Sequence, residues 1–144
     1  MKNVAHAILT AEGNYVLQLR DENPDISEPG VWSLFGGGIE PAESKEEAII
    51  REVQEELCIT LQDFKLLCDF EYFEKTAEHH IYFHIFQSDI SAQWEKCRLL
   101  EGQAVKYFSF NALEKLKIPD IIRKVLRYHY RKLNTPSALE EFNP

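Results

Sequence analysis

Long hydrophobic runs are absent from this 144-residue sequence, and cysteines and basic residues are few. No apolar stretch approaches the roughly 18 residues needed to cross a bilayer, so we expect no membrane-spanning segment. Residues 1–10 do not combine a basic start with an apolar run, as a secretory signal would. The sequence therefore favours a protein that is neither inserted in a membrane nor secreted.

The cysteines are odd in number and far apart, at Cys58, Cys68 and Cys97. They lack the paired spacing of a zinc site, and an odd number does not suit a disulfide framework. We interpret them as reduced thiols of a cytoplasmic protein.

Positive charge is also in short supply, with 16 Lys and Arg against 24 Asp and Glu and a formal net charge of −8. Sequence-independent binding to nucleic acid needs a basic surface facing the phosphates, so nucleic acid is not the expected partner. An acidic protein that handles phosphates would more plausibly do so through bound cations.

The pattern along the chain predicts one domain over residues 1–133 and a polar, loose tail over 134–144. Strands before and after a central helix, with more helix near the end, predict an α/β fold in which a mixed sheet lies between helices. The three consecutive glycines at 36–38 are expected to break any regular element. His79 and His80 are expected in an exposed turn. The expected strands cover residues 4–10, 15–20, 63–73, 80–88 and 103–108, and the expected helices cover 44–57, 111–117 and 119–133.

The central helix is unusually acidic. Ser44 and Glu47 form a capping-box pattern at its start. At about 100° per residue, an apolar stripe should face the core. Three glutamates should gather on another side and point away from the core. The stripe is Ile49, Ile50, Val53 and Leu57, and the glutamates are Glu52, Glu55 and Glu56.

Like charges three and four residues apart destabilise a helix, and the helix dipole disfavours negative charge near the C-terminus. A bound hard cation would reverse both effects, because clustered carboxylates and backbone carbonyls suit Mg²⁺ or Mn²⁺. The alternative is a solvated face on which Glu47, Arg51 and Glu55 form surface ion pairs. The preceding glycines favour the cation, because they let the backbone approach a ligand closely.

These residues resemble a known motif. Gly37, Glu43 and the run from Arg51 to Ile59 match the Nudix box, Gly-x5-Glu-x7-Arg-Glu-U-x-Glu-Glu-x-Gly-U, where U is a bulky aliphatic residue. The order of the flanking elements is similar to the Nudix fold over most of the chain. Cys58 departs from the pattern at the last glycine, which would end the helix in a left-handed conformation. The departure affects the local turn and leaves every acid of the box in place.

The resemblance implies a Nudix (MutT-like) hydrolase, in which water attacks a phosphorus of a nucleoside diphosphate linked to another group. It implies that Glu52, Glu55 and Glu56 hold Mg²⁺ or Mn²⁺ with the Gly37 carbonyl. It also implies that Arg51 orients a catalytic glutamate, and that Glu43 supports the loop or holds a metal-bound water.

Candidate site residues outside the box have weaker support from the sequence. Glu101 precedes a strand where many Nudix enzymes carry an acid that serves as ligand or base, and an ordinary loop glutamate is the alternative. Arg20 could meet a substrate phosphate, together with Gly37 and Gly38, or could be a solvated strand-end arginine. Aromatic residues that could stack on a base, rather than fill the core, are Trp32, Phe35, Tyr72, Phe73 and Phe83.

The last helix is basic, with Arg123, Lys124, Arg127, Arg131 and Lys132. It could touch RNA or an acidic partner, but covering a sheet is the favoured interpretation.

The function predicted is therefore metal-dependent hydrolysis of a small nucleotide, either a nucleoside triphosphate or a nucleotide sugar. The alternative is a Nudix-fold module that binds a nucleotide and regulates without hydrolysis, although such modules tend to lose box acids. The sequence does not fix the oligomeric state; a homodimer is a candidate because dimers are the commonest assembly of small soluble enzymes.

Overall fold

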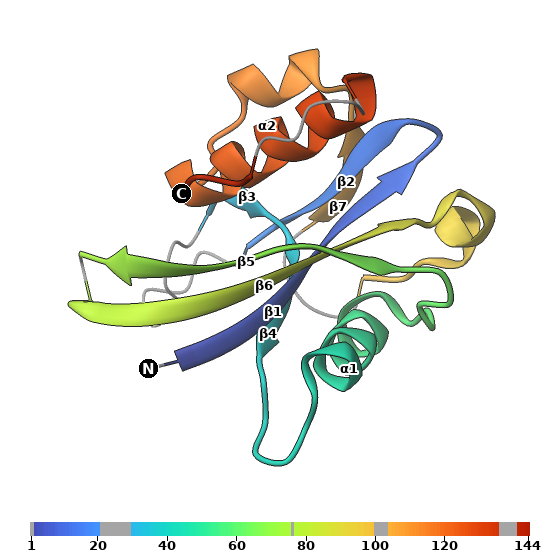
Figure 1. The fold of residues 1–144 in the computed structure, drawn as a ribbon. Helices are drawn as coiled ribbons and strands as arrows, with labels where there is room; N and C mark the ends of the chain where they lie inside the picture. Colours follow the sequence, from blue (N-terminus) through green and yellow to red (C-terminus); the bar gives the residue numbers. More distant parts are fainter. Residues whose placement is uncertain (1, 21–29, 76, 100–103, 136–140) are drawn as a thin grey trace.

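The computed structural model describes residues 2–20, 30–75, 77–99, 104–135 and 141–144. One seven-stranded sheet lies between two helices (Figure 1). The order along its main path is β3-β2-β1-β6-β5, while β4 pairs with β1 and β7 pairs with β2. The strands are β1 (Lys2–Ala11), β2 (Asn14–Leu19), β3 (Trp32–Ser33), β4 (Phe35–Gly38), β5 (Lys65–Glu74), β6 (His79–Asp89) and β7 (Ala104–Phe108).

The sheet is mixed, as predicted. β1 and β6 run parallel in continuous register from Lys2–Ile81 to Thr10–Asp89, whereas the other pairs are antiparallel. A parallel pair requires a crossover connection, and here the chain between β1 and β6 includes α1 (Lys45–Leu57). The remaining helices are η1 (Ser91–Lys96), η2 (Asn111–Lys115) and α2 (Asp120–Asn134).

The two helices cover opposite faces of the sheet (Figure 1). Because successive side chains of a strand point to opposite faces, β1 contributes to both cores. Val4 and Ile8 pack in the cluster that contains α2, and Ala7 and Leu9 pack in the cluster that contains α1. The small alanines of β1 leave room for α1, which places its acidic residues beside β4.

α1 begins as the sequence predicts. Ser44 is the N-cap, its hydroxyl accepts from the Glu47 N–H at 3.0 Å, and the Glu47 carboxylate accepts from the Ser44 N–H at 2.9 Å. This reciprocal pair satisfies two of the unpaired N–H groups of the first turn. At the other end Cys58 is the C-cap and takes the left-handed conformation, with φ 61°. The helix therefore ends as a glycine would end it, although the residue is not glycine.

Several predictions of local structure were wrong. The three glycines do not break regular structure, because Gly36–Gly38 belong to β4 and pair with β1. His79 and His80 lie in β6 and not in a turn, which for His80 agrees with the strand predicted over residues 80–88, and His80 contacts Glu71 at 2.7 Å across the hairpin. Pairing with a neighbouring strand keeps these residues in the sheet although their intrinsic strand propensity is low, because each backbone N–H and C=O gains a hydrogen-bond partner there.

The end of the chain also differs in detail. Pro119 is the N-cap of α2 and lies one residue before the helix, and α2 ends at Asn134. Among the described tail residues, Phe142 packs on Phe70 and Tyr128, with ring centroids 4.6 and 5.3 Å apart. That part of the tail therefore adds to the core on the α2 face. No helix in the described ranges is long and apolar enough to span a membrane.

Candidate active site at the glycines of β4

Two positions of β4 require glycine, because a Cβ at either position would lie too close to neighbouring atoms. Gly36 has a φ of 141°, and a Cβ there would overlap the Ala5 carbonyl and lie 2.6 Å from the Cα of His6. A Cβ on Gly37 would lie 2.6 Å from Oε1 of Glu52, well inside ordinary contact. Gly38 has open space at the same position. The glycines thus bring β4 against β1 on one side and against a carboxylate of α1 on the other.

Arg51 of α1 connects the helix to β4 and to the loop between them, and we call this set of contacts the junction. Its Nε and Nη2 donate to Glu43 at 2.7 and 3.0 Å, Nη1 donates to Glu52 at 2.9 Å, and Nη2 donates to the Gly38 carbonyl at 3.0 Å. Paired guanidinium–carboxylate bonds of this kind are strong and directional. The predicted pairing of Arg51 with a glutamate of the box is present as a contact.

The charges at this junction shift each other's protonation. The bonds donated by Arg51, with a further bond from the Glu40 N–H, lower the pKa of Glu43 to about 2. The bond to Glu43 in turn raises the pKa of Arg51 above its already high value. Both groups stay charged throughout the ordinary pH range, so the loop from β4 to α1 remains fastened to the helix.

The three glutamates of the predicted metal site occupy different environments. Glu52 is 15% exposed and lies against Gly37, whereas Glu55 is 50% exposed and meets Arg51 at 3.4 Å. Glu56 is only 4% exposed. Its Oε1 accepts from the Gly36 N–H at 2.9 Å and its Oε2 accepts from Nε2 of Gln18 at 2.6 Å.

Glu56 therefore does not point away from the core, and that expectation is wrong. Its position on the helix is next to the apolar stripe, and the polar group that receives it comes from the sheet. Gln18 also donates to the Leu34 carbonyl at 3.2 Å and is itself buried. Sequence reasoning missed Gln18, for which the only signal was a polar residue between two leucines, Leu17 and Leu19, of β2.

The donor chemistry suits a hard divalent cation, since carboxylates lie on one helix beside a backbone strand. Within the described residues, however, no three His, Cys, Asp or Glu side chains come together as a metal-binding group. The contacts explain why, because Glu52 is engaged by Arg51 while Glu56 is engaged by Gln18 and Gly36. The predicted ligands are neighbours on α1 that point to different partners.

A cavity of about 480 Å³ adjoins the glycines on the α2 face of the sheet. It is lined by Arg20 and all three glycines, which places these sequence-predicted substrate contacts together. Of the candidate aromatics, Tyr72 and Phe83 line this cavity. Phe35 is fully buried, Phe73 is exposed, and Trp32 packs edge-on against Phe108. Glu101 lies outside the described residues.

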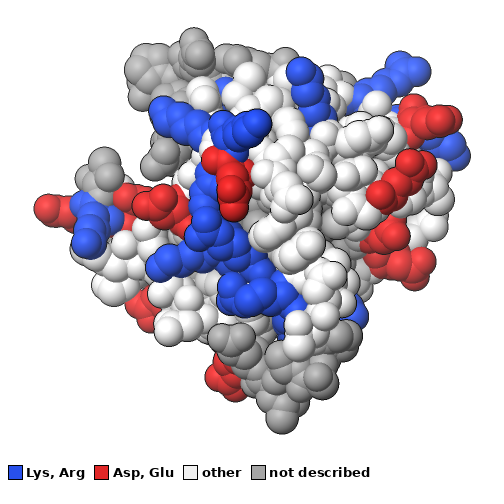
Figure 2. Space-filling model, turned by 90° about the horizontal axis from the view of Figure 1, so that it is seen from above, with Lys and Arg blue, Asp and Glu red and all other residues white. Residues whose placement is uncertain are grey.

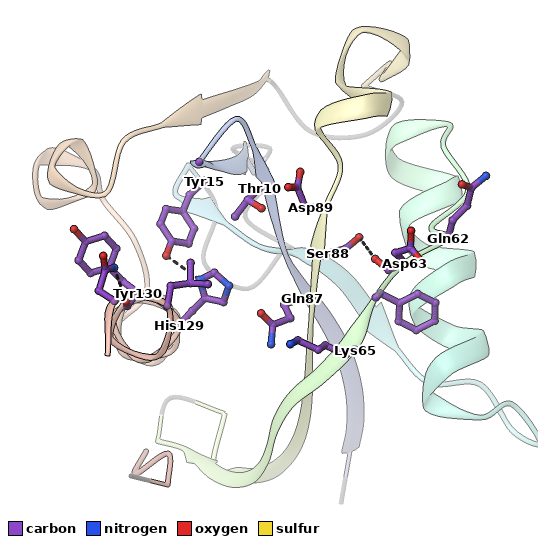
Figure 3. Close-up of a pocket in the computed structure, with 14 residues that line it drawn as sticks. Thr10, Tyr15, Gln62, Asp63, Lys65, Gln87, Ser88, Asp89, His129 and Tyr130 are labelled. Carbon is purple, nitrogen blue, oxygen red and sulfur yellow. Dashed lines mark hydrogen bonds between the residues drawn. The ribbon is translucent and has the colours of Figure 1, made fainter. Parts of the chain in front are cut away.

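A second cavity, of about 730 Å³, lies toward the C-terminal end of α2 (Figure 3). The hydroxyl of Tyr15 and Nδ1 of His129 meet there at 2.8 Å. Burial raises the pKa of Tyr15, while burial and nearby Lys65 lower that of His129 to about 4. None of the residues predicted for the active site lines this cavity. The smaller cavity, which is lined by Arg20 and the glycines but by none of Glu52, Glu55 and Glu56, is therefore the candidate substrate site.

The basic residues predicted on the last helix lie on one face of the molecule. Figure 2 shows Lys and Arg gathered over the surface above the sheet, on the side that carries α2. Ile122, Val125 and Leu126 of the same helix are buried against the sheet. The structure thus bears out the covering role of α2, and a contact with RNA stays untested.

Comparison with known proteins extends these observations. The profile of a family described as the NUDIX domain matches residues 1–129. A relative named nucleoside triphosphatase NudI, from Salmonella agona, is 41% identical over 56 residues. That match covers 39% of this chain and 39% of the relative, so the chain matches well under half of the length of such curated relatives.

Solved structures share the fold over nearly the whole chain. A MutT protein from Methanosarcina mazei is 25% identical, with a TM-score of 0.77 over 93% of this chain and 95% of its own. A MutT NUDIX hydrolase from Burkholderia pseudomallei is 23% identical, with a TM-score of 0.74 over 88% and 96%. The NUDIX domain of Shewanella oneidensis NrtR, solved with ADP ribose, is 18% identical, with a TM-score of 0.76 over 91% and 87%.

Proposed function

Because this chain belongs to the Nudix (MutT-like) hydrolase family, we propose that it hydrolyses the pyrophosphate of a nucleoside diphosphate linked to a second group. The observation that carries the proposal is the junction of Arg51 with Glu43, Glu52 and the Gly38 carbonyl, beside a cavity. Arg51 holds the Glu52 carboxylate and, through Glu43 and the Gly38 carbonyl, also fixes the loop between β4 and α1. This keeps the site in a fixed geometry, as catalysis requires. A purely solvated helix face would not need this arrangement.

The acids of α1 would supply the cation site. Family members generally use divalent metals, and here Glu52, Glu55, Glu56 and the Gly37 carbonyl would hold Mg²⁺ or Mn²⁺. When bound, the cation neutralises the pyrophosphate and lowers the pKa of the attacking water. Arg51 would orient Glu52, and Gln18 with the Gly36 N–H would hold Glu56 in place.

The remaining roles concern the substrate and the proton. Arg20 lines the cavity and would pair with a phosphate, while Gly37 and Gly38 would let the substrate approach the backbone. Glu101 or one of the α1 glutamates would accept the proton from water. In-line attack on phosphorus then needs little more from the protein than positioning and charge.

A nucleoside triphosphate is the substrate we favour. Relatives named nucleoside triphosphatase match this chain over 56 residues, which supports a triphosphate over a nucleotide sugar. Nucleotide sugars are the second substrate class to be tested, because a structurally similar domain was solved with ADP ribose. The alternative function is a nucleotide-binding module that does not hydrolyse. Retention of Glu52, Glu55 and Glu56 counts against it.

We further propose that residues 1–133 act as one domain, in keeping with the family match over residues 1–129. Free thiols at Cys58, Cys68 and Cys97 support a cytoplasmic location. A homodimer is proposed on the frequency of such assemblies alone.

The experiment is a panel of nucleoside triphosphates, nucleotide sugars and ADP-ribose, with Mg²⁺ or Mn²⁺, in which released phosphate and pyrophosphate are measured. Glu52→Gln and Glu55→Gln each remove one carboxylate, and Glu46→Gln is the matched control on the exposed first turn of α1. We expect hydrolysis that disappears without metal and falls in both test variants but persists in the control. Nucleotide binding without any product would instead favour the non-hydrolysing module.

A further inference from the structure

The larger cavity, of about 730 Å³, shares no lining residue with the candidate substrate site. It lies on the α2 face of the sheet, between the C-terminal half of α2 and the ends of four strands (Figure 3). Its volume falls within the range of pockets that hold small organic molecules. The proposed hydrolysis uses none of its side chains, so their chemistry has to be explained separately.

Polar side chains line this cavity on a face of the sheet that is otherwise apolar. Lys65 of β5 and Gln87 of β6 are register partners, and so are Thr10 of β1 and Tyr15 of β2. All four line the cavity. Two residues before Gln87 on β6, Ile85 is fully buried in the core beneath α2. The same face of the sheet therefore changes from core to polar lining within one step along the strand.

The ring of His129 forms the wall on the α2 side of the cavity. Its Nδ1 is satisfied, because it meets the hydroxyl of Tyr15 at 2.8 Å. Its Nε2 makes no hydrogen bond to the described residues. In that part of the chain, the side-chain nitrogen or oxygen that is both unpaired and shut off from solvent is Nδ1 of His6. Nε2 of His129 is therefore accessible, and the space beside the ring is this cavity.

Lys65 brings a positive charge that no acid neutralises. Of the lysines in the described ranges, Lys45 is the one that forms an ion pair. Burial and the nearby charge of Lys65 lower the pKa of His129 to about 4, so the ring is neutral at neutral pH. When the Tyr15 hydroxyl donates to Nδ1, Nε2 carries the hydrogen. Lys65, Gln87 and His129 then direct donors into the same space (Figure 3).

The rest of the lining limits the charge of a ligand. Asp63 and Asp89 also line the cavity, and Asp89 accepts from the Ser91 N–H and hydroxyl at 2.9 and 2.6 Å. One ammonium beside two carboxylates disfavours a polyanion such as a triphosphate, but a single negative charge can lie against the ammonium. Tyr130 and Leu133 add apolar surface, with 37% and 59% of each residue exposed.

We infer that this cavity is a second ligand site, which binds a small organic monocarboxylate. Lys65, Gln87 and Nε2 of His129 hold the carboxylate, and Tyr130 and Leu133 contact the apolar body of the ligand. A charge-assisted hydrogen bond from an ammonium to a carboxylate is about twice as strong as a neutral one, so Lys65 contributes most. The alternative is that these side chains are a solvated edge of the core and that Tyr15 and His129 only satisfy each other.

Three probes separate the parts of this inference. Benzoate has one carboxylate on an apolar ring, benzamide has the same shape without the charge, and inorganic pyrophosphate is a polyanion. In amide NMR titrations without metal, we expect benzoate to give saturable shifts confined to residues that line this cavity. Benzamide should bind on the order of 10-fold more weakly, because it loses the charged hydrogen bond. Pyrophosphate should leave the resonances of these residues unchanged.

Variants then identify the groups that hold the carboxylate. Lys65→Met keeps the length of the side chain and removes its charge, and the dissociation constant of benzoate should rise on the order of 10-fold. Lys124→Met is the matched control, since Lys124 is an exposed lysine of α2 that lines neither cavity. Its affinity for benzoate should equal that of wild type. Lys65 is itself exposed, so the melting temperature should be the same in both variants.

Several results would overturn the inference. Equal affinity for benzoate and benzamide, or unchanged affinity in Lys65→Met, would show that no carboxylate is held at Lys65. Shifts at Arg20 and the β4 glycines instead would place the anion in the other cavity, and a dissociation constant weaker than about 10 mM would mean that no site exists. The titration needs neither metal nor turnover. Its failure would leave the proposed hydrolysis standing, and an enzyme without hydrolytic activity could still pass it.

Discussion

The glycines of β4 allow the fold and the chemistry to be perturbed separately. In Gly37→Ala the new Cβ meets the end of a flexible side chain, the carboxylate of Glu52, at 2.6 Å. The carboxylate would have to retreat by about 0.8 Å to reach the 3.4 Å of ordinary contact. A misplacement near 1 Å costs about 100-fold in rate when the group is catalytic. We therefore expect kcat to fall about 100-fold.

The stability of the same variant should hardly change. Glu52 is partly exposed, and the contacts of such an ion pair are worth about 1 kcal/mol or less. Gly36→Ala is the contrasting variant, because its Cβ would meet backbone at a φ of 141°. Strain and overlap of that kind cost about 3 kcal/mol or more, roughly 10 °C in melting temperature for a chain of this size. Gly38→Ala, with open space, should melt within about 1 °C of wild type.

The assay combines thermal unfolding by circular dichroism with initial rates on the best substrate of the panel, and Glu46→Gln again serves as the activity control. The reasoning requires that Gly37→Ala lose rate while it stays folded. Full activity in Gly37→Ala would refute the role of Glu52 at this position. A melting temperature as low as that of Gly36→Ala would refute the distinction between flexible and rigid neighbours.

Three further predictions follow from the contacts of α1. The pKa of Glu43 falls from 4.5 to about 2 on folding, so its stabilising effect is complete above pH 4.5 and is lost as the pH falls toward 2; in Glu43→Gln the melting temperature should decline less across that window, and an identical decline would contradict the prediction. Gln18→Leu removes a donor from buried Glu56 and should lower the free energy of unfolding by about 1–3 kcal/mol in urea titration, whereas unchanged stability would mean that water replaces the amide. Cys58→Gly relieves the left-handed conformation and should stabilise the protein by about 1 kcal/mol, visible as a melting temperature roughly 3 °C higher; a lower value would show that the thiol makes compensating contacts.

Local sequence rules predicted much of the scaffold because they depend on residues close in the chain. The capping box at Ser44 and Glu47 and the apolar stripe of α1 are helical patterns, and the helix begins where they indicate. The turn residues after Ala11 and the alternating apolar residues of β5 and β6 likewise predicted strands. In the structure β1 pairs with β2 and β5 pairs with β6, both antiparallel. The spacing from Gly37 to Glu56 was enough to predict the family.

The predictions that failed involve partners distant in the sequence. The glycines of β4 form a strand because β1 supplies pairing partners from 30 or more positions away, and no local propensity contains that information. The orientation of Glu56 depends on Gln18 of β2, and that of His6 depends on the space left by Gly36.

The sequence alone determined the acidic helix, its cap and the spacing of the box, because a helix places its residues by a fixed rotation of the chain. Only the tertiary structure decided that Glu56 is buried, that Arg51 holds Glu43 and Glu52 together, and that His6 keeps a nitrogen without a partner beside the cavity. The physical reason is that burial and hydrogen bonding are set by which surfaces meet when the sheet forms.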